Sequence, residues 1–322
     1  MSPSFAEILQ SDQFTFYVGA EKRSVTVHSA AIATTSKPMN VLINGRMSEA
    51  ETRCATLPDI EVDDFHRFCE YAYRGDYTVP SWITHVSEPL PAGQDDEEWK
   101  RHAGIPDVSE PVSANIYDNG WDFPATTGKK KKGKKVSRFL ESEEPPPPAP
   151  APEPEPEPEP SCLPKFPKSE LRNQLHSRKY LTLGNPSTEL KGGFNPVFNS
   201  SADQNFTPVL LAHARLYAFA NVRLVDSLKA LALHKLQQTL LNFKLYRKRV
   251  GDVIELARYA YSNEHTPDRG SREVDSLRRL VVEYISSEVD IIGECPEFVD
   301  LLREGGEFVE DFWDLARTYL IS

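Results

Sequence analysis

Residues 14–28 read FTFYVGAEKRSVTVH, and this stretch decides the fold. Apolar side chains alternate with polar or small ones on both sides of a polar segment, at Phe14, Phe16, Val18, Val25 and Val27. An alternation of period two is typical of strands that bury one face. The segment between the two runs holds a glycine and three charged residues, which favours a turn in solvent. The stretch therefore predicts an antiparallel β-hairpin.

Short helices and one further strand are expected around this hairpin. Helical spacing of apolar residues and residues that favour helix ends define each helix. The expected elements are a helix over residues 5–10 capped by Ser4, a helix ending at Asn44-Gly45, a strand over residues 54–58 and a helix over residues 62–73. Together they predict a small mixed sheet flanked by helices.

The periodic pattern fails from Thr78 to about Asn205. This stretch contains a lysine run and, over residues 145–160, a proline-rich tract that starts with four prolines and ends in alternating Glu and Pro. Such a composition cannot bury enough apolar surface to offset the entropy of the chain. A loop of this length without secondary structure is uncommon inside a compact domain. We therefore predict a disordered insertion over residues 78–205, in which the proline tract is an extended spacer of roughly 50 Å, at ~3.1 Å per residue.

Helical periodicity returns after the insertion and continues to the last residues. Two helices are expected over residues 206–246, with a break near residues 221–224, and a helical extension over residues 250–322. Within the extension we expect Asp252 and Ser271 to cap helices and Trp313 to lie in the core. The predicted fold class is α+β, with a split N-terminal domain and an all-helical C-terminal extension.

Composition and charge exclude several classes of function. The 322 residues carry a net charge of −11, which disfavours binding to a nucleic-acid backbone. There is no run of about 18 apolar residues to span a membrane, and residues 1–7 lack the features of a signal peptide. The four cysteines are widely spaced and suggest neither a disulfide framework nor a metal site. We therefore expect an intracellular protein in the nucleus or the cytoplasm.

The chain also shows no constellation for catalysis. His28 has no nucleophile or second histidine at ligand spacing around it, so a structural role is expected. A phosphate-binding loop is likewise missing from the sequence. We predict that the protein is not an enzyme and needs no cofactor.

The ordered pieces resemble a BTB/POZ domain, in the divergent form common among fungal proteins. The resemblance rests on the order and spacing of several short passages. These are Asp12, Val27-His28, Ser36, Leu42, Asn44-Gly45 with Met47 and Glu49, Leu57-Pro58-Asp59, Asp64-Phe65, Tyr73-Arg74-Gly75-Asp76-Tyr77, and the helical stretches over residues 210–220 and 228–232. It covers about residues 12–77 and 208–243, which the insertion separates, and it departs from the usual pattern at Ser29 and Met39.

The resemblance implies a protein-interaction module, an adaptor or a scaffold. In relatives that recruit substrates to cullin-RING ubiquitin ligases, an apolar-x-Glu motif helps to hold the cullin, and Met47-Ser48-Glu49 matches it. An exposed apolar side chain beside a carboxylate suits such a contact. The alternative is that Met47 packs on its own domain. The expected partner-binding residues are Leu42, Met47, Glu49, Asp12 and Phe65, of which Asp12 resembles a residue at the subunit interface of some BTB homodimers.

The lysine run leaves a second function open. Lys129, Lys130, Lys131, Lys132, Lys134 and Lys135 form a candidate nuclear localisation signal. The alternative is a solvated charge run that neighbouring glutamates neutralise. The leading expectation is an adaptor or scaffold whose partner is a protein such as a cullin. The alternative is a nuclear oligomerisation scaffold associated with transcription, which needs both the lysine run and homodimerisation.

Overall fold

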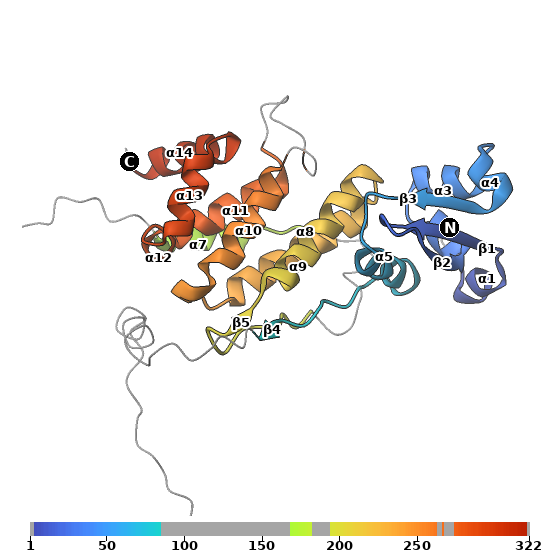
Figure 1. Ribbon diagram of the computed structural model, residues 1–322, viewed down its shortest axis with the longest axis horizontal. Coiled ribbons are helices and arrows are strands. Elements are labelled where there is room, and N and C mark those ends of the chain that lie inside the picture. Colours follow the sequence, from blue (N-terminus) through green and yellow to red (C-terminus); the bar gives the residue numbers. More distant parts are fainter. Residues whose placement is uncertain (1–2, 85–167, 182–193, 263–265, 267–273, 321–322) are drawn as a thin grey trace, which may run out of the picture. The chain divides into compact units, whose positions relative to one another are not determined.

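The computed structural model describes residues 3–84, 168–181, 194–262, 266 and 274–320 (Figure 1). These residues belong to one compact unit made of residues 1–92 and 164–322. The lysine run, the proline tract and the residue Ser271 lie outside the described residues. Within the described part, no helix has the length and apolar character needed to cross a membrane.

The predicted hairpin is confirmed, and it supplies two of the three strands of a mixed sheet. Strand β1 pairs antiparallel with β2 and parallel with β3, so β1 lies in the centre. The strands are β1 (Gln13–Val18), β2 (Arg23–His28) and β3 (Cys54–Leu57). Phe14, Phe16 and Val18 are fully buried, as their alternation predicts. In the turn, Gly19 has a φ of +72°, a value that glycine adopts without strain.

Five helices accompany this sheet in the N-terminal part. They are α1 (Phe5–Gln10), α2 (Ser29–Ala33), α3 (Lys37–Asn44), α4 (Ser48–Thr52) and α5 (Val62–Arg74). Ser4 caps α1 in a capping box, and Ser36 caps α3 through the amide of Met39. Gly75 ends α5 with a φ of +72°. The short helix α4 was not expected from the sequence, because its residues are all polar or small and none is buried.

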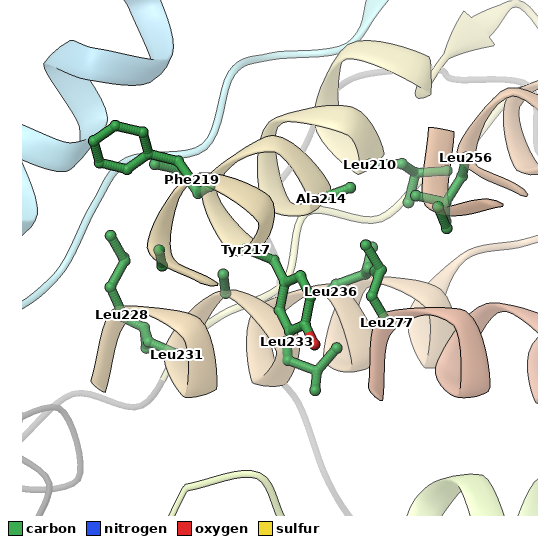
Figure 2. Packing of buried hydrophobic residues seen from close by; sticks show 14 of the residues in the cluster. Leu210, Ala214, Tyr217, Phe219, Leu228, Leu231, Leu233, Leu236, Leu256 and Leu277 are labelled. Carbon is green, nitrogen blue, oxygen red and sulfur yellow. The ribbon is translucent and has the colours of Figure 1, made fainter. Parts of the chain in front are cut away.

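The C-terminal part is helical, as predicted. Its long elements are α8 (Thr207–Val222), α9 (Asp226–Asn242), α10 (Val250–Tyr261), α11 (Ser276–Ser287), α13 (Pro296–Glu304) and α14 (Glu307–Leu320), with the short turns η2 (Arg247–Arg249) and α12 (Val289–Ile292). Figure 2 shows Tyr217 of α8 extending toward α9, and Leu210 of α8 beside Leu256 of α10. Burial of these apolar side chains stabilises the helices of this part.

The halves of the split domain share one core across the insertion. The ring of Phe68 on α5 lies 5.0 Å from that of Phe219 on α8. Arg223, at the end of α8, donates to both carboxylate oxygens of Asp59, at 2.9 and 3.1 Å. Residues 5–77 and 206–243 therefore pack as neighbours although more than a hundred residues separate them in the chain.

The predicted disorder is wrong at both ends of the insertion. Strand β4 (Ile83–Thr84) pairs antiparallel with β5 (Gln204–Asn205), and α7 (Lys168–Ser177) is a helix. Leu171 and Leu175 of α7 are fully buried. A stripe of two leucines among polar residues is too short to stand out in a polar, proline-rich sequence, which is why the pattern missed it.

Three expectations for the helical extension also need correction. Asp252 does not cap α10, which begins at Val250; its carboxylate accepts from the amide of Phe206 and the hydroxyl of Thr207, at the start of α8. Asp275, not Ser271, caps α11, through the amide of Leu277. Trp313 is 57% exposed. It follows Phe308 and Phe312 on α14, and only one face of that helix is turned to the core.

Candidate functional site

An exposed apolar groove lies along α3. It has a volume of about 440 Å³. Its lining comes from two segments far apart in sequence: Lys37, Pro38, Met39, Val41, Leu42 and Met47, together with Arg223 and Leu224. Val41 is 47% exposed, Met47 56% and Leu224 61%. Large apolar side chains gathered on one face are typical of a protein-interaction site.

A set of hydrogen bonds holds the turn between α8 and α9 against this groove. The hydroxyl of Ser36, which caps α3, donates to the carbonyl of Arg223 at 2.8 Å. The next residue, Leu224, has a φ of +53°. A leucine in the left-handed region costs roughly 1–2 kcal/mol, and here it places a large apolar side chain in solvent. A strained residue that exposes an apolar group is a reason to expect a function at that position.

Two basic residues, Lys37 and Arg223, belong to the lining of the groove. Lys37 is exposed at its α3 end, and Arg223 contributes a guanidinium that Asp59 holds. Glu49 is half-buried in α4, two residues beyond Met47, and accepts a hydrogen bond from the hydroxyl of Ser48 at 3.1 Å. Met47 immediately precedes α4, and its exposed side chain is not part of the hydrophobic core. The structure thus exposes the apolar residue of the Met47-Ser48-Glu49 motif.

The other expected contact residues are placed differently. Leu42 is half-buried and packs on the core with one side while it lines the groove with the other. Asp12 is exposed and forms an ion pair with Arg53. Phe65 is fully buried between Phe16 and Phe68, with ring centroids 5.1 and 5.8 Å away. Its side chain cannot contact a partner, so we assign Phe65 to the core; its helical spacing alone could not separate these roles.

His28 is held by a tyrosine. Its Nδ1 lies 2.8 Å from the hydroxyl of Tyr73, and its backbone amide donates to the same oxygen at 2.9 Å. The described residues contain no cluster of three or more side chains that could hold a metal ion. These bonds give His28 a structural task at the end of β2.

A buried polar cluster, which the sequence did not reveal, lies where the chain leaves the N-terminal part. The hydroxyl of Tyr77 and Nδ1 of His213 are 2.6 Å apart. Lys235 donates to the carbonyl of Tyr77 at 2.7 Å and forms an ion pair with Asp76. Tyr77, His213 and Lys235 are all buried, so a solute cannot reach them. We assign the cluster a structural role; no local sequence signal marks it, because its members come from distant segments.

The burial of His213 makes stability depend on pH. Burial, and secondarily the charges of Lys235 and Arg67, lower its pKa to about 3, from about 6.5 in the unfolded chain. The unfolded state therefore binds a proton below pH 6.5 that the folded state does not, and the fold loses roughly 1.4 kcal/mol per pH unit from this group. We expect the loss in unfolding free energy between pH 7.5 and 5.5 to be about 1 kcal/mol smaller in His213→Asn than in the unaltered chain.

Urea unfolding at the two pH values measures this difference. Other groups titrate alike in both proteins and cancel in the comparison. Equal losses in the two proteins would show that His213 is not held neutral by the fold.

The N-terminal part of the chain matches a known protein family. The family model described as the BTB/POZ domain matches residues 5–90. Neither the curated proteins nor the solved structures include a match to this chain.

Proposed function

Residues 5–90 of this chain are a BTB/POZ domain, and on this premise we propose that the protein is a non-enzymatic interaction module that binds a protein partner at the groove beside α3. BTB domains mediate protein–protein interactions. The observation that carries the proposal is the exposure of Val41, Met47 and Leu224 around one groove. A partner that covers these side chains removes apolar surface from water, which stabilises the complex.

The partner that fits this site best is a cullin, with the protein acting as a substrate adaptor of a cullin-RING ubiquitin ligase. The support is the match of Met47-Ser48-Glu49 to the apolar-x-Glu motif of cullin-binding relatives, together with the exposure of Met47. The apolar groove accepts an apolar side chain, and Lys37 in its lining orients the partner by charge.

Titration of the full chain with a purified cullin tests this proposal. We expect the double substitution Met47→Asp, Glu49→Lys to weaken binding at least about tenfold, because central exposed anchors carry most of the binding energy of an interface. Calorimetry gives the dissociation constants. The matched control is Val299→Asp, an exposed apolar residue on α13, which should leave the affinity unchanged.

Two results would count against the adaptor role. If the double variant binds the cullin as tightly as the unaltered chain, the motif is not the contact. If the unaltered chain does not bind a cullin at all, the adaptor role fails, whereas the groove can still serve another protein.

Self-association is the second candidate function. BTB domains also mediate dimerisation, and Phe5 and Leu9 on α1 are 61% and 50% exposed. A second copy of the domain would cover them. The nuclear scaffold associated with transcription needs both this dimer and the lysine run over residues 129–135. The mass of the purified chain by light scattering separates a scaffold, at twice the mass of one chain, from a monomeric adaptor.

A further inference from the structure

Helix α7 lies on the C-terminal helices although it comes from the far end of the predicted insertion. It contacts α11, next to which Figure 1 draws it in yellow-green. Leu171 and Leu175, four residues apart, are its buried side chains, and Leu175 belongs to the main hydrophobic core. Residues at this spacing share one face of a helix. The other side of α7 is exposed, so the helix sits on the surface like a bound amphipathic peptide.

Two arginines of this segment pair with carboxylates that are almost completely buried. Arg172 donates to Glu288 at 2.9 Å. Arg178, just after α7, holds Glu283 with two hydrogen bonds, of which the one from Nε is 2.6 Å long. Glu283 and Glu288 are 5% and 6% exposed. A buried carboxylate needs a charged or hydrogen-bonding partner, and here α7 and the residue after it supply that partner.

A third contact binds the carbonyl groups at the C-terminal end of α7. The amide nitrogen of Gln237, on α9, donates to the carbonyls of Leu175 and Arg178, at 2.5 and 3.0 Å. The last carbonyls of a helix have no partner within the helix. Gln237 is buried, and its amide oxygen has no hydrogen-bond partner among the described residues. This side chain therefore binds the carbonyl end of α7.

The attachment of α7 is small compared with that of its neighbours. α7 has ten residues and buries two leucines, whereas α11 buries ten of its residues. Isolated helices of this length are marginal in water, so α7 holds its shape only while it is docked. In the sequence, the long segment of residues 85–167 precedes α7, and the shorter segment of residues 182–193 follows Leu181.

We propose that the face of α9 and α11 beneath α7 is a docking groove for a basic amphipathic helix, and that α7 is its tethered, exchangeable occupant. The residues that contact the groove define the pattern Leu-Arg-x-x-Leu-x-x-Arg, from Leu171 to Arg178. The partner is a protein helix with two leucines on one face and arginines that reach Glu283 and Glu288. Binding of such a helix displaces α7. This site is separate from the groove beside α3 and does not depend on the function proposed there.

A peptide-exchange experiment on the full chain tests the groove. The substitutions Leu171→Asp and Leu175→Asp release α7, and a fluorescent peptide with the sequence of residues 168–181 is the probe. We expect fluorescence anisotropy to show binding to this variant at least tenfold tighter than to the unaltered chain, whose groove is occupied. The same peptide with Arg172→Glu and Arg178→Glu should bind at least tenfold more weakly, because both charge pairs become repulsive.

Hydrogen exchange of the unaltered chain provides a second readout that does not require a variant to fold. An exchangeable α7 should exchange its amides faster than α9 and α11, and excess peptide should speed that exchange further. The proposal is overturned if α7 exchanges only together with α11. It is also overturned if the peptide fails to bind the folded variant, or binds it no more tightly than the unaltered chain.

Discussion

Replacement of Phe65 by alanine should destabilise the protein by about 3–5 kcal/mol, because the substitution removes a fully buried ring and leaves a cavity. Phe65 stands on α5 and touches the sheet and the helix core at once: its ring centroid lies 5.1 Å from that of Phe16 and 5.8 Å from that of Phe68. The packed surroundings have little room to collapse into the space that the ring leaves. Chemical unfolding followed by circular dichroism gives the loss of free energy.

A second Phe→Ala substitution provides the matched control. Phe5 on α1 is 61% exposed, so Phe5→Ala should change the free energy of unfolding by no more than about 0.5 kcal/mol. Since both changes delete the same atoms, the difference between them measures burial. Losses of equal size at the two positions would contradict the assignment of Phe65 to the core and reopen its role as a partner contact.

The second large effect is expected at Arg278, whose side chain is almost completely buried. Its Nε donates to the carbonyl of Ala260 at 3.2 Å and to the hydroxyl of Thr266 at 2.7 Å. The guanidinium also pairs with Glu307 on α14 and lies 5.1 Å from the ring centroid of Tyr261. One side chain thus joins α10, α11 and α14. Arg278→Met keeps the apolar stem and removes these donors, and we expect a loss of about 3–5 kcal/mol.

Arg303 is the control for this substitution. It lies on α13, is 74% exposed and forms an ion pair with Asp300, three residues earlier, at 2.9 Å. Exposed pairs of this kind contribute little, so Arg303→Met should cost at most about 0.5 kcal/mol. Thermal unfolding of both variants compares them, and a similar fall in Tm would show that the buried network around Arg278 does not hold the extension together.

The parts of the fold that the sequence predicts are those in which local pattern and burial agree. The alternation from Phe14 to Val27 gave the hairpin, and the end of α5 at Gly75 followed from helix termination. The break between α8 and α9 near Leu224 was also expected. In each case, neighbours in sequence carry the information.

The missed features depend on residues that meet only in three dimensions. Asp252 has the sequence context of a helix cap, yet its carboxylate serves a helix that begins 45 residues earlier in the chain. Leu224 adopts a left-handed backbone conformation next to Arg223, whose carbonyl is bound by Ser36 and whose guanidinium is bound by Asp59. Local propensity contains none of these contacts, so the groove that they shape could not be predicted.

For the candidate site, the sequence pointed to one segment of the groove and to only part of its lining. Met47 was expected at a contact surface, and the structure exposes it. Leu224 escaped notice because more than 170 residues separate it from Met47, and Phe65 was misplaced because a buried and an exposed aromatic residue share the same helical spacing.

Quantitative affinity capture with the full chain tests the central claim, that a protein partner binds the groove beside α3. The experiment compares three proteins by mass spectrometry of what each retains: the unaltered chain, the variant Met47→Asp, Leu224→Asp, and the control Val299→Asp. The account predicts a stable protein partner that the unaltered chain and the control retain equally and that the groove variant loses. A set of retained proteins that the groove variant leaves unchanged would contradict it.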